Sequence, residues 1–242
     1  MKKLFNDTVY LDFYTDSPTI QEYFPISPSR NYIPSWWKKI PSPEGSYDRK
    51  RTVKRCSGFM DLFKNTYTVP LSTEILIDIK DKDYYIEPRD NSFNIHHLKN
   101  AHPSYQRESF LPEPTYSHVK IPVKWKALSS HDLDIIVIPP TWVNDPLFVN
   151  TINVLSASKN LFYDTSMHWH FMLNKQEDQV FTIEPNTPMY YFAPLTDKKV
   201  VVRTYYNPEK YNELEKYPLI SSFGFNSSFY KMKKFMNKRL KK

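Results

Sequence analysis

Two histidines one residue apart, His168 and His170, are the residues whose spacing points most directly to chemistry in this sequence. Alternate residues of a strand project to the same face, so two imidazoles at this spacing could bind one metal ion. Glu177 follows seven residues after His170 and is a candidate carboxylate ligand. The alternative interpretation is that both histidines are ordinary strand residues at the edge of a sheet.

This spacing resembles the first metal motif of cupins, in which a His-x-His pair is followed by a glutamate. The resemblance implies a jelly-roll enzyme with one transition metal, iron or manganese. The interval from His170 to Glu177 is longer than in that motif, and no histidine follows His170. Oxygenases that use Fe(II) and 2-oxoglutarate need two histidines and a carboxylate, but no histidine here has an acid two residues later. Arg203 could clamp 2-oxoglutarate, although an ordinary solvated strand residue is the favoured interpretation.

Residue usage argues against other catalytic designs. The three glycines lie too far apart in the chain to form a glycine-rich phosphate-binding loop. Cys56 is the single cysteine, so an internal disulfide and a multi-cysteine zinc site are excluded. Lys54 and Arg55 could lower the pKa of its thiol, but no base lies near it in the sequence. We therefore predict that Cys56 is a small buried residue before a turn.

The last twelve residues are strongly cationic. They contain no acid and seven basic residues, which are Lys231, Lys233, Lys234, Lys238, Arg239, Lys241 and Lys242. The whole chain has 33 Lys and Arg against 26 Asp and Glu, so its net charge of +7 belongs to this segment. Apolar residues recur every three or four positions over 228–240, which predicts a helix with one apolar stripe. Such a tail suits contacts with phosphates or an anionic partner, and the alternative is a solvated helix end.

Residues 17–50 contain six prolines. Proline at this density disfavours helices and central strands, so this segment is predicted to be an extended arm that wraps the body of the protein. Trp36 and Trp37 lie beside two lysines in the arm. They are candidates for docking the arm onto the body or onto a neighbouring subunit.

The rest of the chain reads mainly as short strands. Strand-like runs cover residues 8–15, 67–71, 73–80, 83–87, 119–128, 134–138, 150–155, 161–163, 169–173, 180–184, 189–194 and 199–206. Residues 67–87 are predicted to be a meander with a hairpin turn at 80–83, and 208–217 to be a helix that begins at a proline. We therefore predict one mainly β domain over 1–242, with a jelly-roll or cupin-like β-sandwich core at 67–206 and a helical basic tail at 208–242.

Four spaced segments carry a family resemblance. They are residues 32–41 (YIPSWWKKIP), 52–61 (TVKRCSGFMD), 162–165 (FYDT) and 181–189 (FTIEPNTPM). Together they resemble an uncharacterised family of proteins from tailed phages, notably marine and cyanobacterial phages, and from some bacteria. Asn186 stands where that family has a glycine before Thr-Pro. The resemblance implies a phage origin and a compact β architecture, and it carries over no activity and no catalytic residue.

The leading hypothesis is a non-enzymatic phage-type binding or structural protein without a cofactor, either a virion component or an accessory factor. The missing catalytic set, the predicted arm and the cationic tail motivate it, and a protein partner or self-assembly is expected. One alternative is a metal-dependent jelly-roll enzyme that uses His168 and His170. Another is a nucleic-acid-binding accessory protein acting through the tail, whose affinity would fall steeply with salt. No signal peptide and no run of roughly 18 apolar residues is present, so we expect no membrane partner and a location in the host cytoplasm or the virion.

Overall fold

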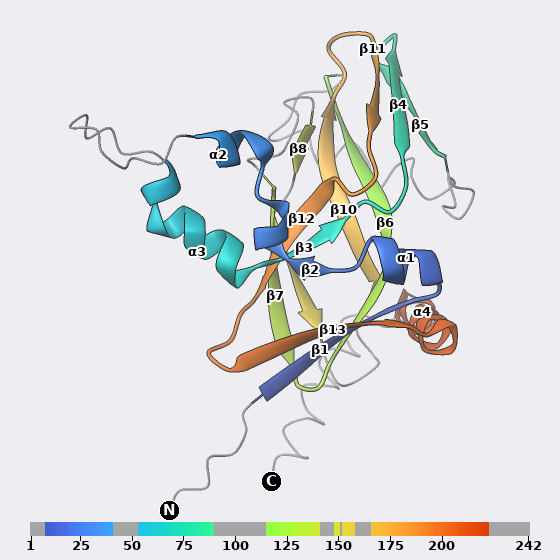
Figure 1. The fold of residues 1–242 in the computed structure, drawn as a ribbon. Coiled ribbons are helices and arrows are strands. Elements are labelled where there is room, and N and C mark those ends of the chain that lie inside the picture. The colour runs from blue at the N-terminus through green and yellow to red at the C-terminus, as the bar shows by residue number, and fades with distance from the viewer. Residues whose placement is uncertain are drawn as a thin grey trace, which may run out of the picture.

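The computed structural model describes residues 8–40, 53–89, 115–140, 148–150, 152–157 and 166–222. Within these residues the chain is mainly β, with thirteen strands in three sheets and four α-helices (Figure 1). The predicted mainly β class is therefore confirmed. The predicted basic helix of the tail and the predicted strand at 161–163 lie outside the described residues.

The first sheet has five strands in the order β13-β1-β6-β10-β8. Its strands are β1 (Thr8–Thr15), β6 (Tyr116–Ser129), β8 (Phe148–Asn150), β10 (Ser166–Asn174) and β13 (Lys199–Tyr206). β1 runs parallel to β13, and every other neighbouring pair in the sheet is antiparallel. The first and last strands of the described chain therefore lie side by side in one sheet.

The second sheet also has five strands, all antiparallel, in the order β2-β3-β12-β7-β9. Its strands are β2 (Ser27–Pro28), β3 (Tyr67–Pro70), β7 (Leu133–Ile138), β9 (Asn153–Ala157) and β12 (Pro188–Pro194). The predicted meander is wrong in its first strand, because β3 pairs with β2 and β12. The single strand predicted at 150–155 is also wrong, because the chain passes there from β8 in the first sheet to β9 in the second.

The third sheet has three antiparallel strands in the order β11-β4-β5, and it projects beyond the two larger sheets (Figure 1). Its strands are β4 (Ile75–Lys80), β5 (Asp83–Pro88) and β11 (Gln179–Ile183). The turn between β4 and β5 holds Asp81 at φ 53° and Lys82 at φ 62°. Two left-handed residues are what a two-residue type I′ hairpin requires, so the predicted turn at 80–83 is confirmed.

The strand pairs of the two large sheets are nested along the chain. β1 pairs with β13, β3 with β12, β6 with β10 and β7 with β9, and successive pairs alternate between the first and second sheets. Each inner pair lies between the strands of the next outer pair. The three inner pairs are antiparallel and form one long hairpin that curls across both sheets, whereas the outermost pair is parallel. This curling places β6 beside β10, although a long stretch of chain separates them.

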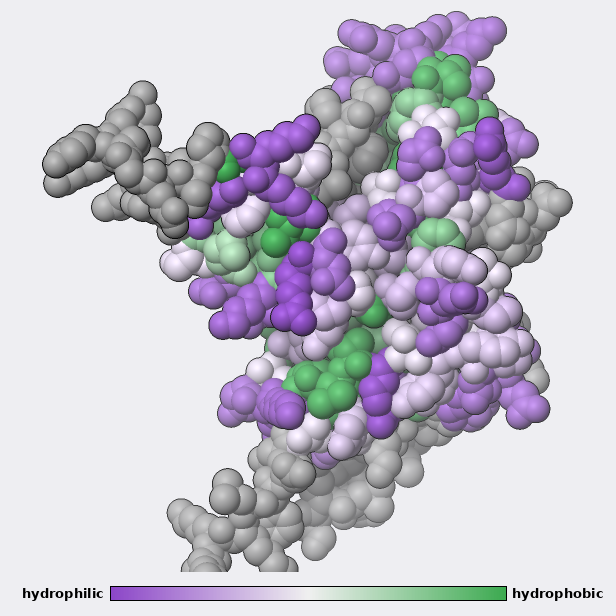
Figure 2. All heavy atoms as spheres, in the orientation of Figure 1, coloured by the Kyte–Doolittle hydropathy of each residue, from purple (hydrophilic) through white to green (hydrophobic). Residues whose placement is uncertain are grey.

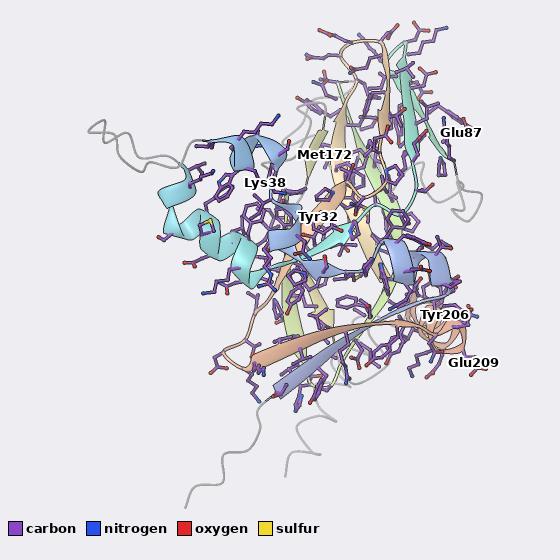
Figure 3. The ribbon with its side chains drawn as sticks, in the orientation of Figure 1. Tyr32, Lys38, Glu87, Met172, Tyr206 and Glu209 are labelled. Atoms are coloured by element: carbon purple, nitrogen blue, oxygen red, sulfur yellow. The ribbon has the colours of Figure 1, made fainter. Side chains whose placement is uncertain are left out.

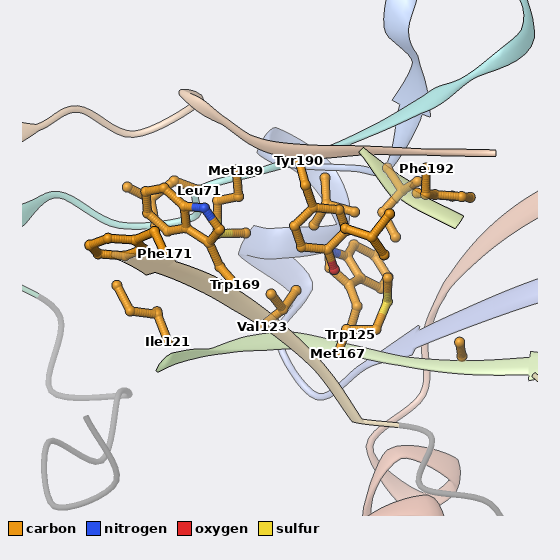
Figure 4. Close-up of a cluster of buried hydrophobic side chains, with 14 of the residues drawn as sticks. Leu71, Ile121, Val123, Trp125, Met167, Trp169, Phe171, Met189, Tyr190 and Phe192 are labelled. Atoms are coloured by element: carbon orange, nitrogen blue, oxygen red, sulfur yellow. The ribbon is translucent and has the colours of Figure 1, made fainter. Parts of the chain in front are cut away.

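The hydrophobic core fills the space between the two large sheets. The ring of Phe13 on β1 lies 5.5 Å from the ring of Phe192 on β12, which joins the sheets face to face. Trp125 and Trp169 are each only 1% exposed, and Figure 4 shows them among other buried side chains, including Tyr190. These large rings belong to the core, and the polar residues that alternate with them on β6 and β10 must face outward.

The described part of the proline-rich segment is folded into short helices, so the predicted extended arm is wrong there. It contains α1 (Pro18–Tyr23), a 3₁₀ turn η1 (Ser29–Tyr32) and α2 (Ser35–Lys39). Pro18 occupies the first turn of α1, and the backbone N–H of Ile20 donates to the hydroxyl of Ser17 at 3.3 Å. A proline in the first turn costs no helical hydrogen bond, so Pro18 is compatible with the start of α1, and Pro34 lies just before α2 as its N-cap residue.

Two further helices complete the fold. A 3₁₀ turn η2 (Val53–Arg55) leads into α3 (Ser57–Asn65), whose buried Phe59 and Phe63 form a second cluster with Tyr191 of β12. α4 (Pro208–Ser222) begins after Asn207, whose side-chain oxygen accepts the backbone N–H of Lys210 at 2.9 Å. The helix predicted at 208–217 is therefore confirmed, with a longer span.

Candidate functional site

The fold does not assemble the predicted metal set of His168, His170 and Glu177. His168 and His170 lie on the outer face of β10, since Trp169 between them points into the core. Glu177 is exposed in the turn after β10. At about 3.3 Å per residue, Asn174 at the end of β10 already lies roughly 13 Å beyond His170 along the strand. Among the described residues no three His, Cys, Asp or Glu side chains gather as a metal site, so the set with Glu177 is wrong.

The fold brings His118 of β6 against His170. The Nε2 atom of His118 lies 3.1 Å from Nδ1 of His170, and their ring centroids are 5.2 Å apart. The ring of His168 lies 5.9 Å from that of His170, at an angle of 62°. These three imidazoles, which we call the histidine group, share one face of two adjacent strands. His118 could not be found from the sequence, because it precedes His170 by 52 residues and only the strand register brings the two together.

The histidine group lies in a cationic environment. Burial is the main cause that lowers the pKa of His168 from 6.5 to about 3, and the charges of Lys120, His170 and Lys126 lower it further. Lys120 pairs with His170 in the register of β6 and β10, so it occupies the same outer face. The imidazole of His168 is therefore uncharged throughout the physiological range. It can donate or accept a hydrogen bond but carries no positive charge of its own.

A second group, which we call the Tyr–Arg ladder, occupies the same outer face at β1 and β13. It consists of Tyr10, Asp12, Tyr14, Arg203 and Tyr205. Arg203 binds Asp12 with two hydrogen bonds, Nε to Oδ1 at 2.6 Å and a terminal nitrogen to Oδ2 at 2.8 Å. The hydrogen bond to Asp12 is the main cause that raises the pKa of Arg203. This side chain faces outward and is already engaged, so the geometry does not favour a role as a 2-oxoglutarate clamp.

Aromatic rings hold the guanidinium of the ladder on both sides. The Cζ atom of Arg203 lies 4.3 Å from the ring centroid of Tyr10 and 5.7 Å from that of Tyr205. The ring of Tyr14 stacks on Tyr205 with centroids 5.5 Å apart and an angle of 22°. Tyr10 is 40% exposed and Tyr205 36% exposed. The ladder is therefore an ordered aromatic surface with a fixed planar cation at its centre, and it remains open to solvent.

The outward-facing charges on the described strands β13, β1, β6 and β10 are mostly positive. The cations are Lys120, Lys124, Lys126, Lys199 and Arg203, and the acid on these strands is Asp12. α4 borders the face, where Glu215 lies 3.7 Å from the ammonium of Lys126 and the ring of Tyr211 lies 5.3 Å from it. Figure 3 places Tyr206 and Glu209 at the junction of β13 and α4. The face is therefore cationic on its strands and meets acidic residues at α4.

Trp36 and Trp37, the predicted docking residues of the arm, differ in exposure. Trp37 stacks on Phe59 of α3 with ring centroids 6.0 Å apart, and the ammonium of Lys54 lies 5.4 Å from its centroid. Trp36 is 41% exposed, and Met60 of α3 is 38% exposed. In Figure 2 the apolar side chains on this side of the molecule form separate small patches, some over α2–α3 and some over β13. None of the apolar patches in that view is therefore large enough by itself to indicate a binding partner.

Cys56 is exposed immediately before α3, so the prediction of a buried cysteine is wrong. Its backbone N–H donates to the carbonyl of Val53 at 3.0 Å, and this turn leaves the side chain outside the core. The seven basic residues of the tail, from Lys231 to Lys242, lie outside the described residues.

Comparison with known proteins finds no family model, curated protein or solved structure that matches the chain. Within the described residues, no helix has the length and apolar character needed to cross a bilayer. The candidate functional surface is the outer face of the first sheet, with the Tyr–Arg ladder on β1 and β13.

Proposed function

We propose that this chain is a non-enzymatic binding protein of the phage virion or accessory type, and that its Tyr–Arg ladder docks a protein partner. The observation that carries the proposal is the fixed guanidinium of Arg203 between Tyr10 and Tyr205, all on an exposed strand face. Tyrosine and arginine are enriched among the residues that dominate binding energy at protein interfaces. Rings and a guanidinium that are already ordered lose little conformational entropy on binding.

The charges around the ladder indicate the chemistry of the partner. Arg203 is neutralised by Asp12, so the centre of the ladder is a polar and aromatic surface without net charge. Two outward lysines lie beside the ladder, since Lys199 of β13 pairs with Thr8 at the start of β1 and Lys126 of β6 pairs with Tyr14. A partner with an apolar or aromatic centre and an acidic rim complements this arrangement. A nucleic acid is less suited to the ladder itself, because phosphate contacts need cations that are not paired with an acid.

We further propose that the two large sheets form a modified jelly roll. Nested pairing that alternates between two sheets supports this, as does the order β3-β12-β7-β9 of the second sheet. The first sheet differs, since β1 lies between β13 and β6 and runs parallel to β13. In this arrangement the ladder lies on the outside of the roll, away from the interior where a jelly-roll enzyme would hold its cofactor.

Site-specific photo-crosslinking tests the proposed docking surface. The variant Tyr205→benzoylphenylalanine would be produced in the cells that naturally make the chain and then irradiated. We expect one discrete protein adduct, which is either another protein or a second copy of this chain. The same adduct should be lost when Arg203→Ala is added, because the guanidinium then no longer orders Tyr10 and Tyr205.

The matched control is Tyr85→benzoylphenylalanine on β5, because Tyr85 is 45% exposed and lies in the third sheet away from the ladder. The control should give no adduct of the same mass. The proposal is refuted by equal adducts from both positions, by adducts that survive Arg203→Ala, or by adducts to nucleic acid in place of protein. The last result would instead favour a nucleic-acid-binding protein.

A further inference from the structure

The paired imidazoles of His118 and His170 have a geometry that the docking function does not use. Their facing nitrogens, Nε2 and Nδ1, are 3.1 Å apart on the outer face of β6 and β10. With zinc–nitrogen bonds of about 2.0–2.1 Å and a tetrahedral angle, two imidazole nitrogens on one zinc ion are roughly 3.3 Å apart. We propose that His118 and His170 form a two-imidazole chelate for a divalent metal ion of the zinc class.

Strand pairing fixes this geometry. In the antiparallel register of β6 and β10, Lys120 pairs with His170 and His118 pairs with Met172, so the two histidines are diagonal neighbours on one face. Strand backbones constrain such neighbours more firmly than a loop would, so a metal ion would meet two ligands already in position. Each neutral imidazole carries one proton. Binding requires these protons on Nδ1 of His118 and Nε2 of His170, which leaves the two facing lone pairs to the metal.

The ligand type selects the metal. Imidazole nitrogens suit zinc, copper, nickel and iron, whereas manganese and magnesium prefer carboxylate and other oxygen ligands. Among the described residues no carboxylate joins the histidines in a group of three. The ring of His168 lies 5.9 Å from that of His170 and is the nearest further imidazole with a described contact to the pair. Metal ions that prefer imidazole, zinc among them, therefore fit the pair, with water in their remaining positions.

Lys120 allows a test in which the proposal predicts the direction of a change in zinc affinity. Its ammonium shares the face of the chelate, and a dication bound there would be repelled by it. Removing this charge should strengthen metal binding by about threefold, the order expected for a solvent-screened charge pair. A purely structural histidine–histidine hydrogen bond predicts no such effect, because that role involves no dication.

The experiment is a zinc titration of the full-length chain after treatment with a chelator, followed with a competing chromophoric zinc indicator. His118→Gln and His170→Gln should each weaken the site by at least about tenfold, since even the loss of an outer-shell partner typically costs that much. His131→Ala is the matched control, because His131 is an exposed histidine that binds Ser130 away from the pair. It should leave the affinity unchanged, while Lys120→Ala should raise it.

Unchanged zinc affinity in His118→Gln and His170→Gln would place the metal elsewhere and overturn the proposal, as would an unchanged affinity in Lys120→Ala. A loss caused by His168→Ala but not by His118→Gln would replace the proposed pair with the pair predicted from sequence. If the glutamine variants do not fold, the unaltered chain provides the second measurement. Zinc should then protect both His118 and His170 from modification by diethyl pyrocarbonate, as read by peptide mass spectrometry, and the absence of protection overturns the chelate.

Discussion

The buried hydroxyl of Tyr190 makes a prediction whose sign can be worked out from the structure. Tyr190 is 2% exposed and lies in the core between the two large sheets (Figure 4). Among the residues that the structure describes, its hydroxyl oxygen has no hydrogen-bond partner. A buried polar group without a partner costs about 1–3 kcal/mol, because the water it bound in the unfolded chain is not replaced. The change Tyr190→Phe removes that cost and should stabilise the protein.

The net gain is smaller than the full cost, because the phenyl ring leaves a small void. A void of about 10 Å³ costs roughly 0.2 kcal/mol at about 24 cal/mol per Å³. We therefore expect Tyr190→Phe to raise the free energy of unfolding by about 1–2 kcal/mol. For a protein of this size that corresponds to an increase of about 2–8 °C in Tm.

Urea unfolding of the full chain at neutral pH measures the effect, with Tyr32→Phe as the matched control. The hydroxyl of Tyr32 donates to Oδ1 of Asn186 at 3.0 Å. The same chemical change should therefore lower stability at Tyr32 by about 0.5–1.5 kcal/mol. If the free energy of unfolding falls with urea concentration at the same slope in both variants, only stability has changed.

The pH dependence of stability in the alkaline range provides a second test of the buried Tyr190 hydroxyl. Burial raises the pKa of Tyr190 well above its ordinary value, whereas in the unfolded chain this hydroxyl ionises near 10. Its folded-state pKa is raised, so its contribution to stability is fully present below about pH 10 and is lost as pH rises further. The advantage of Tyr190→Phe should therefore grow above pH 10. Destabilisation by Tyr190→Phe at neutral pH, or an advantage that stays constant from pH 8 to 11, would refute the reasoning.

Two further predictions concern a turn and a strand. Asn186 has φ 67°, so Asn186→Ala should lower the free energy of unfolding by roughly 1–2 kcal/mol, through the left-handed backbone and the lost hydrogen bond to Tyr32. Asn186→Gly should lower it less, because glycine adopts this backbone without strain. Thermal unfolding of both variants measures the difference, and equal losses of stability would contradict the prediction. Trp169→Ala should cost about 3–5 kcal/mol in urea unfolding, because this ring is fully buried. His168→Ala, on the opposite face of the same strand, should cost much less, and similar losses at both positions would contradict the assignment of inner and outer faces.

Several features of the fold follow from local sequence. Alternating residues at 8–15 and a run rich in Val and Tyr at 199–206 predicted two strands with the observed bounds, because both signals lie in consecutive residues. The hairpin at 80–83 and the helix that begins at Pro208 were also predictable, since turns and helix starts depend on residues within a few positions. Asn186 has a left-handed φ, which is a conformation that glycine and asparagine tolerate.

The candidate site was harder to predict. His168 and His170 were predicted to share one face of a strand, but Glu177 was wrongly grouped with them because the strand carries it too far from the pair. The short helices of the proline-rich segment were missed because proline opposes helix interiors but favours first turns. In that segment the same residues are compatible with an arm or with helices, and packing of Trp37 on Phe59 favours the helices.

The sequence by itself indicated the mainly β class, the bounds of strands such as 8–15 and 199–206, and which catalytic motifs are absent, because these depend on residue type and short-range spacing. Only the tertiary structure decided which strands are neighbours. It placed Asp12 against Arg203, 191 residues later, and His118 against His170. Such pairs depend on the register that buries the most apolar surface across two sheets, and that is a property of the whole chain. Both proposed sites rest on pairs of this kind.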